Sequence, residues 1–96
     1  MDNRRVVITG VGAVTALGLD TNSTWRGVTN GENGVRAIDH FDASGFSTRF
    51  SASLNGFTTD GYLASRDAKR MDSFIQYGMV AGIQAMRDSG LEITEQ

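Results

Sequence analysis

The segment from Arg66 to Ser89, RDAKRMDSFIQYGMVAGIQAMRDS, constrains this chain most. It opens with clustered cations and continues as a helix in which apolar or small side chains face almost every direction. A helix that is apolar nearly all round must be buried in a larger body of protein. We therefore expect a chain that is incomplete on its own or that requires an oligomeric partner.

The boundaries of this helix follow from its flanking residues. We predict a start between Ser65 and Met71 and an end at Ser89, where Gly90 provides the stop. Two glycines inside a helix cost about 2 kcal/mol in helix propensity, so tight packing must offset them. A neighbouring backbone can approach closely over the small residues Gly78, Ala81, Gly82 and Ala85.

Two strands are predicted upstream of the long helix. Arg5 to Gly10 contains the β-branched run Val6 to Ile8, which is typical of a strand buried on both faces. Arg49 to Gly56 alternates apolar and polar residues, which indicates a strand with one buried face. Two strands make a poor sheet, because three or more are normally needed for independent stability.

A shorter helix is expected from about Ser23 to Thr29, with Gly31 as its C-terminal stop. Trp25 and Val28 lie three residues apart and are predicted to share its buried face. The possible N-cap residues are Asp20, Thr21, Asn22 and Ser23.

Composition excludes several classes of protein. The net charge of −2 gives no support for bulk attraction to nucleic acid or membranes. Cysteine is absent, which excludes disulfides, thiolate metal sites and a cysteine nucleophile within these 96 residues. No run approaches the roughly 20 apolar residues of a membrane span, and no secretory signal is visible. We expect a cytoplasmic protein.

Two motifs could carry chemistry, and both are weak. Gly10-Val11-Gly12 follows the first predicted strand, but a dinucleotide fingerprint needs a third glycine at the position of Thr15. His40 is the single histidine, and one histidine cannot form a metal site without further ligands. We therefore expect no cofactor, no metal and no catalytic residue in this chain.

Arg66, Lys69 and Arg70 form the most informative cluster. Their spacing of i, i+3 and i+4 places them on one helix face, with only Asp67 among them. Positive charge at the start of a helix is mildly unfavourable, which suggests that these cations bind a partner outside the chain. An acidic partner or a phosphate would fit that role. A solvated basic helix end explains the same pattern equally well.

The chain resembles the beta-ketoacyl-ACP synthases, and most closely their type II elongating members. The resemblance spans essentially residues 1–96, and the specific run Arg-Met-Asp-x-Phe-x-Gln-Tyr begins at Arg70. The matching segments are Arg4 to Gly12, Thr24-Trp25, Gly31 to Gly34, Ile38 to Asp42, Lys69 to Gly78 and Ala85 to Leu91.

This resemblance implies that residues 1–96 are the N-terminal portion of a thiolase-like, layered α/β fold in a homodimeric enzyme. Such enzymes transfer an acyl group to a cysteine and condense it with malonyl-ACP, releasing carbon dioxide. The family's cysteine and two histidines match no position here, and His40 matches a non-catalytic position. We therefore expect the 96 residues alone to be inactive.

The family also docks the acidic acyl carrier protein through basic residues that correspond to Arg66, Lys69 and Arg70. Two alternatives remain open at this point. The chain could be a non-catalytic module that binds acyl carrier protein or a synthase subunit. A nucleotide-binding fragment is the weaker alternative.

Overall fold

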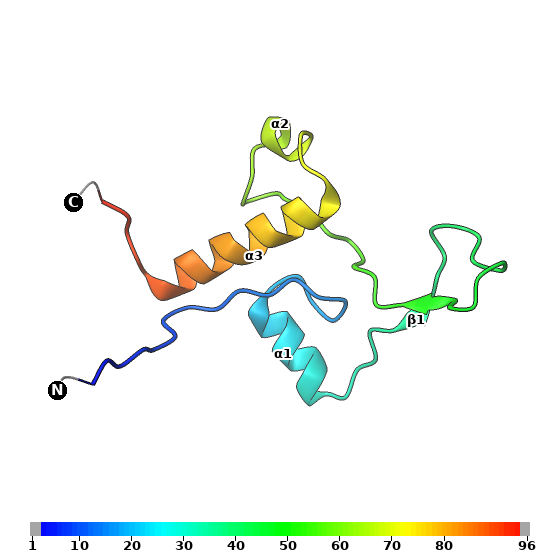
Figure 1. Ribbon diagram of the computed structural model, residues 1–96, viewed down its shortest axis with the longest axis horizontal. Helices are drawn as coiled ribbons and strands as arrows, with labels where there is room; N and C mark the ends of the chain where they lie inside the picture. Colours follow the sequence, from blue (N-terminus) through cyan, green and yellow to red (C-terminus); the bar gives the residue numbers. More distant parts are fainter. Residues whose placement is uncertain (1–2, 95–96) are drawn as a thin grey trace.

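The computed structural model describes residues 3–94, so both ends of the expected 1–96 segment lie outside it. The chain runs from one helix through two short paired strands to two further helices, which is consistent with part of an α/β domain (Figure 1). Among residues 3–94, no helix is long and apolar enough to cross a membrane. The elements are α1 (Thr21–Thr29), β1 (Arg36–Ala37), β2 (Phe50–Ser51), α2 (Ser65–Ala68) and α3 (Ser73–Ser89).

α3 is the longest element, and its C-terminal end was predicted correctly. Gly90 follows Ser89 in the left-handed region with φ 71°, which ends the helix. The predicted start was wrong, because Asp72 is extended (φ −66°, ψ 160°) and separates α3 from α2. Asp72 is the N-cap residue of α3 by its backbone geometry and makes no side-chain cap hydrogen bond, and aspartate is a poor residue for a helix interior.

The N-terminal segment runs alongside α3 at very short range (Figure 1). A methyl group added to Gly12 would collide with the carbonyl oxygen of Ala81. One added to Gly10 would collide with the carbonyl oxygen of Ala85 and would lie 2.8 Å from Cβ of Ser89. The prediction that a backbone approaches the small residues of this helix is therefore confirmed at Ala81 and Ala85.

Polar side chains of α3 complete this contact. The Gln84 carboxamide accepts a hydrogen bond from the Ala13 N–H (3.1 Å) and donates one to the Leu19 carbonyl (2.7 Å). Asp88 accepts from the Val11 N–H at 3.0 Å. Side chains of α3 thus satisfy backbone groups that an irregular segment would otherwise leave to water.

The strand predicted over Arg5 to Gly10 is not formed. Val6 and Ile8 are 93% and 85% exposed, and this stretch has no regular secondary structure. A strand needs the N–H and C=O groups of a neighbour, and residues 3–94 place no strand beside this one. The predicted burial of this β-branched run on both faces was therefore wrong within this chain.

The strand predicted over Arg49 to Gly56 is much shorter in the structure. Only β2 forms, pairing antiparallel with β1 so that Arg36 faces Ser51 and Ala37 faces Phe50. Phe50 is 62% exposed, so its predicted buried position was wrong. Neither face of a two-stranded ribbon is buried unless another layer of protein packs against it.

α1 begins at Thr21, two residues before the predicted start. Its N-cap is Asp20, which accepts a hydrogen bond from the Ser23 N–H at 2.7 Å. Gly31 follows the helix with φ 68°, as expected of a C-terminal stop. Trp25 and Val28 were predicted to be buried, but they are 66% and 52% exposed, because no element packs on that side within residues 3–94.

The described residues enclose almost no core. The only buried hydrophobic residues among them are Ala43, Ala68 and Val80. The radius of gyration is 17.3 Å, against about 12.5 Å for a compact domain of this length. Phe74 on α3 is 72% exposed, so the predicted burial of the long helix is not realised here. This agrees with the expectation that the chain cannot enclose its own helix.

The contact at Gly12 yields the first prediction. In the intact protein that carries this chain, Gly12→Ala should lower the free energy of unfolding by about 1–3 kcal/mol, because the new methyl group meets backbone atoms that cannot rotate away. Urea unfolding measures the change. Gly45→Ala is the control, since nothing lies within 4 Å of that position, and it should change stability by less than about 0.5 kcal/mol. Equal effects of the two substitutions would contradict the packing.

The cap of α1 yields a prediction with a pH dependence. The Ser23 N–H lowers the pKa of Asp20, so the ionised cap stabilises the fold above the ordinary carboxyl pKa. Asp20→Ala should therefore destabilise by about 1 kcal/mol at neutral pH. The difference from wild type should shrink as the pH falls through the lowered pKa, because the protonated carboxyl is a weaker acceptor. Asp20→Asn should retain most of the cap, and a difference that persists unchanged in acid would refute the assignment.

Candidate partner-binding surface

α2 is a single turn that projects from α3. Its N-cap is Ala64, which makes no side-chain cap. Backbone hydrogen bonds from Lys69 to Ser65 and from Met71 to Ala68, both 3.1 Å long, close the turn. Ala68 is 7% exposed and anchors α2 against the rest of the chain.

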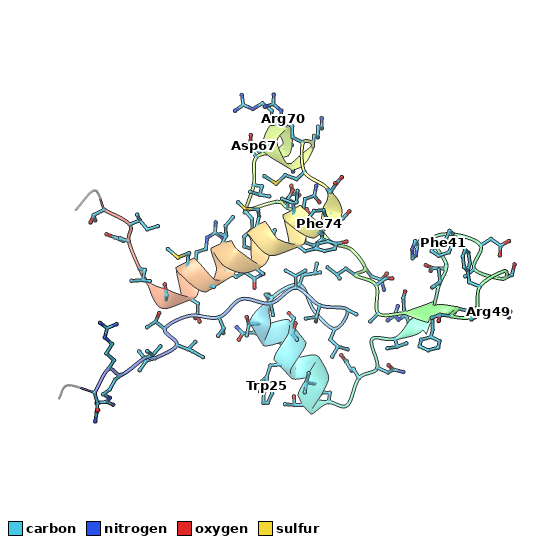
Figure 2. All side chains as sticks on the ribbon, in the orientation of Figure 1. Trp25, Phe41, Arg49, Asp67, Arg70 and Phe74 are labelled. Carbon is cyan, nitrogen blue, oxygen red and sulfur yellow. The ribbon has the colours of Figure 1, made fainter. Side chains whose placement is uncertain are left out.

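The three predicted cations lie together on this turn and are all exposed. We name the set of Arg66, Lys69 and Arg70 the basic turn. Figure 2 shows Arg70 and Asp67 at the outer end of this region, away from α3. The predicted position at the start of the long helix was wrong, because the extended Asp72 places the basic turn on α2 and the turn after it.

Few negative charges compete for the basic turn. Arg66 Nε lies 3.8 Å from the Asp67 carboxylate, and their side chains are 82% and 50% exposed. An exposed pair at that distance contributes little free energy, so the Arg66 guanidinium stays available to a partner. Asp72 is the other nearby carboxylate in sequence. The local excess of positive charge therefore stands out on a chain whose net charge is −2.

Side chains of α3 hold this region, and sequence reasoning missed them. The Gln76 carboxamide donates to the carbonyls of Ala68 (2.8 Å) and Met71 (3.4 Å). Arg87 donates to the Gly61 carbonyl at 2.8 Å, and its guanidinium lies 4.9 Å from the centre of the Tyr62 ring. The sequence does contain a signal for these contacts, because Gln76 and Arg87 are among the few polar residues in an otherwise apolar helix.

His40 shows no catalytic arrangement. It is exposed, and its ring meets Phe41 edge-on at 4.8 Å between ring centres. A hollow of about 500 Å³ beside it is also lined by Ser73 and Tyr77. Residues 3–94 contain no group of three or more potential ligands that could hold a metal ion.

The glycine pair at Gly10 and Gly12 serves a purpose other than phosphate binding. Both glycines allow contact with the backbone of α3. The next helix, α1, begins only at Thr21, and the Asp20 carboxylate occupies its N-terminus. A carboxylate there repels a phosphate and takes up an amide that would bind one. The geometry therefore gives the nucleotide alternative no support.

Comparisons with known proteins agree with the sequence resemblance. Residues 3–96 match the family model described as "Beta-ketoacyl synthase, N-terminal domain". Over all 96 residues the chain is 47% identical to 3-oxoacyl-[acyl-carrier-protein] synthase 2 of Vibrio cholerae and 49% identical to that of Vibrio harveyi. It is 40% identical over 88 residues to the chloroplastic 3-oxoacyl-[acyl-carrier-protein] synthase I of Arabidopsis thaliana, which covers 92% of this chain.

The chain spans only part of each relative, 23% of the length of the two Vibrio proteins and 19% of the Arabidopsis protein. The family model, by contrast, covers almost every residue of this chain. The chain therefore belongs to the beta-ketoacyl synthase family and corresponds to sequence within that family's N-terminal domain.

Proposed function

We propose that this chain is the N-terminal segment of a 3-oxoacyl-[acyl-carrier-protein] synthase, and that its basic turn docks acyl carrier protein. The enzyme would condense an acyl thioester with malonyl-ACP during fatty-acid elongation. The observation that carries the proposal is identity of 47–49%, over all 96 residues, to two proteins with that name.

The segment's role in the enzyme would be structural and recognitional. Val6 to Ile8 would become a strand of a thiolase-like layered sheet, and the apolar surface of α3 would be covered by further layers. The nucleophilic cysteine and the two histidines would come from outside these 96 residues, which contain no cysteine and only His40. The segment alone would be inactive, and the enzyme would be a cytoplasmic homodimer.

The basic turn suits an acidic partner for physical reasons. Its three cations are exposed, and the one ion pair among them is long and solvated. Long, mobile cations attract an approaching acidic surface and accelerate encounter more than they tighten the final complex. Such attraction weakens as salt concentration rises, because exposed charges are screened over about 8–10 Å at moderate ionic strength.

The docking role predicts the effect of one charge reversal. In the intact protein, Lys69→Glu should raise the Kd for acyl carrier protein about tenfold or more at low salt, because attraction becomes repulsion at the centre of the basic turn. Calorimetric titration measures the Kd, and high salt should reduce the difference between variant and wild type.

Arg36→Glu is the matched control. It makes the same change of charge on exposed β1, far from α2 in Figure 1, and should leave the Kd nearly unchanged. Wild-type affinity in Lys69→Glu would overturn the docking role. Titration of the 96 residues alone tests the alternative of a binding module, which would be favoured by saturable binding to a folded monomer that Lys69→Glu abolishes.

A further inference from the structure

The basic turn has little intrinsic rigidity. α2 has four residues and no side-chain cap, and a helix of this length is not stable by itself in water. Its one ion pair is exposed and weak. The relative positions of Lys69 and Arg70 must therefore be set by what holds the turn from outside.

Gln76 on α3 holds that turn at both ends. Its carboxamide nitrogen donates to the carbonyl of Ala68 at 2.8 Å and, more weakly, to that of Met71 at 3.4 Å. These two carbonyls flank Lys69 and Arg70 in the sequence, so one side chain spans the cationic pair. Gln76 is itself partly buried, which strengthens its hydrogen bonds relative to exposed ones.

We propose that Gln76 is a positioning residue for partner docking, which holds Lys69 and Arg70 in one arrangement before the acidic carrier protein arrives. The inference rests on the proposed docking function. Its physical basis is preorganisation: a turn fixed in advance loses less conformational freedom on binding than a mobile one. Gln76 itself would not touch the partner.

Loss of this side chain should be tolerated by the fold. The Ala68 carbonyl also accepts a hydrogen bond from the Met71 N–H at 3.1 Å, so removing Gln76 leaves it with a partner. Gln76→Leu keeps a similar volume but cannot donate. It should therefore loosen the basic turn while the Ala68 carbonyl keeps its partner, and the partly exposed Met71 loses only a weak 3.4 Å hydrogen bond.

A double-mutant cycle in the intact protein tests the proposal, with the Kd for acyl carrier protein measured by calorimetry. Gln76→Leu should weaken binding about fivefold, the effect of one net hydrogen bond. In a background of Lys69→Ala with Arg70→Ala, the same change should cost less than about twofold, because the groups it positions are gone. An equal loss in both backgrounds would reveal a general structural effect and overturn the proposal.

Gln84→Leu is the matched control, since Gln84 is a glutamine of the same helix that holds the N-terminal segment instead of α2. It should leave the Kd unchanged, and an effect equal to that of Gln76→Leu would overturn the proposal. Should Gln76→Leu fail to fold, Gln76→Met replaces it in the cycle, because this uncharged, unbranched side chain of similar size also cannot donate a hydrogen bond.

The cycle also separates the two levels of inference. If Lys69→Ala with Arg70→Ala weakens binding and Gln76→Leu does not, the positioning role is wrong and the docking role stands. If the two alanine substitutions leave the affinity at its wild-type value, the docking role is wrong, and the positioning role falls with it.

Discussion

α3 carries apolar side chains around much of its circumference, and within residues 3–94 only Val80 on this helix is buried. The rest of the chain meets α3 by other means. Glycines allow the N-terminal segment to touch its backbone. Gln84 and Asp88 hydrogen-bond to that segment, and Gln76 hydrogen-bonds to the end of α2. The helix thus joins distant parts of the sequence through polar contacts, while its apolar residues Phe74, Ile75, Met79 and Met86 stay exposed.

This arrangement explains why a cationic surface can lie on so short an element. α2 has almost no stability of its own, but it is attached to the first turn of α3 through Gln76 and buries Ala68. The extended Asp72 turns the chain between the two helices, and Arg70 lies away from α3 (Figure 2). If α2 and α3 formed one continuous helix, the basic turn would instead lie in line with α3.

Sequence predicted features that depend on local chemistry. The end of α3 at Gly90 and the stop of α1 at Gly31 follow from the freedom of glycine at positive φ. The cations of the basic turn were identified because i, i+3 and i+4 spacing brings residues together in one helical turn, even though the helix is not the one expected. The docking role of these cations stays a prediction.

Features that depend on distant partners could not be predicted in the same way. The strand predicted over Arg5 to Gly10 and the buried face predicted for Trp25 would require neighbours that residues 3–94 do not supply. The roles of Gln76 and Gln84 were missed because each side chain hydrogen-bonds to backbone groups. Every residue has such groups, so the type of the partner residue gives no indication of the contact.

Hydrogen exchange on the 96-residue chain alone, combined with its thermal melting, tests most directly whether α3 depends on outside protein for its burial. We expect the α3 amides to exchange rapidly and the chain to melt without a cooperative transition, because its apolar side chains lack a cover. A monomer that melts cooperatively and protects the amides throughout α3 would contradict this view.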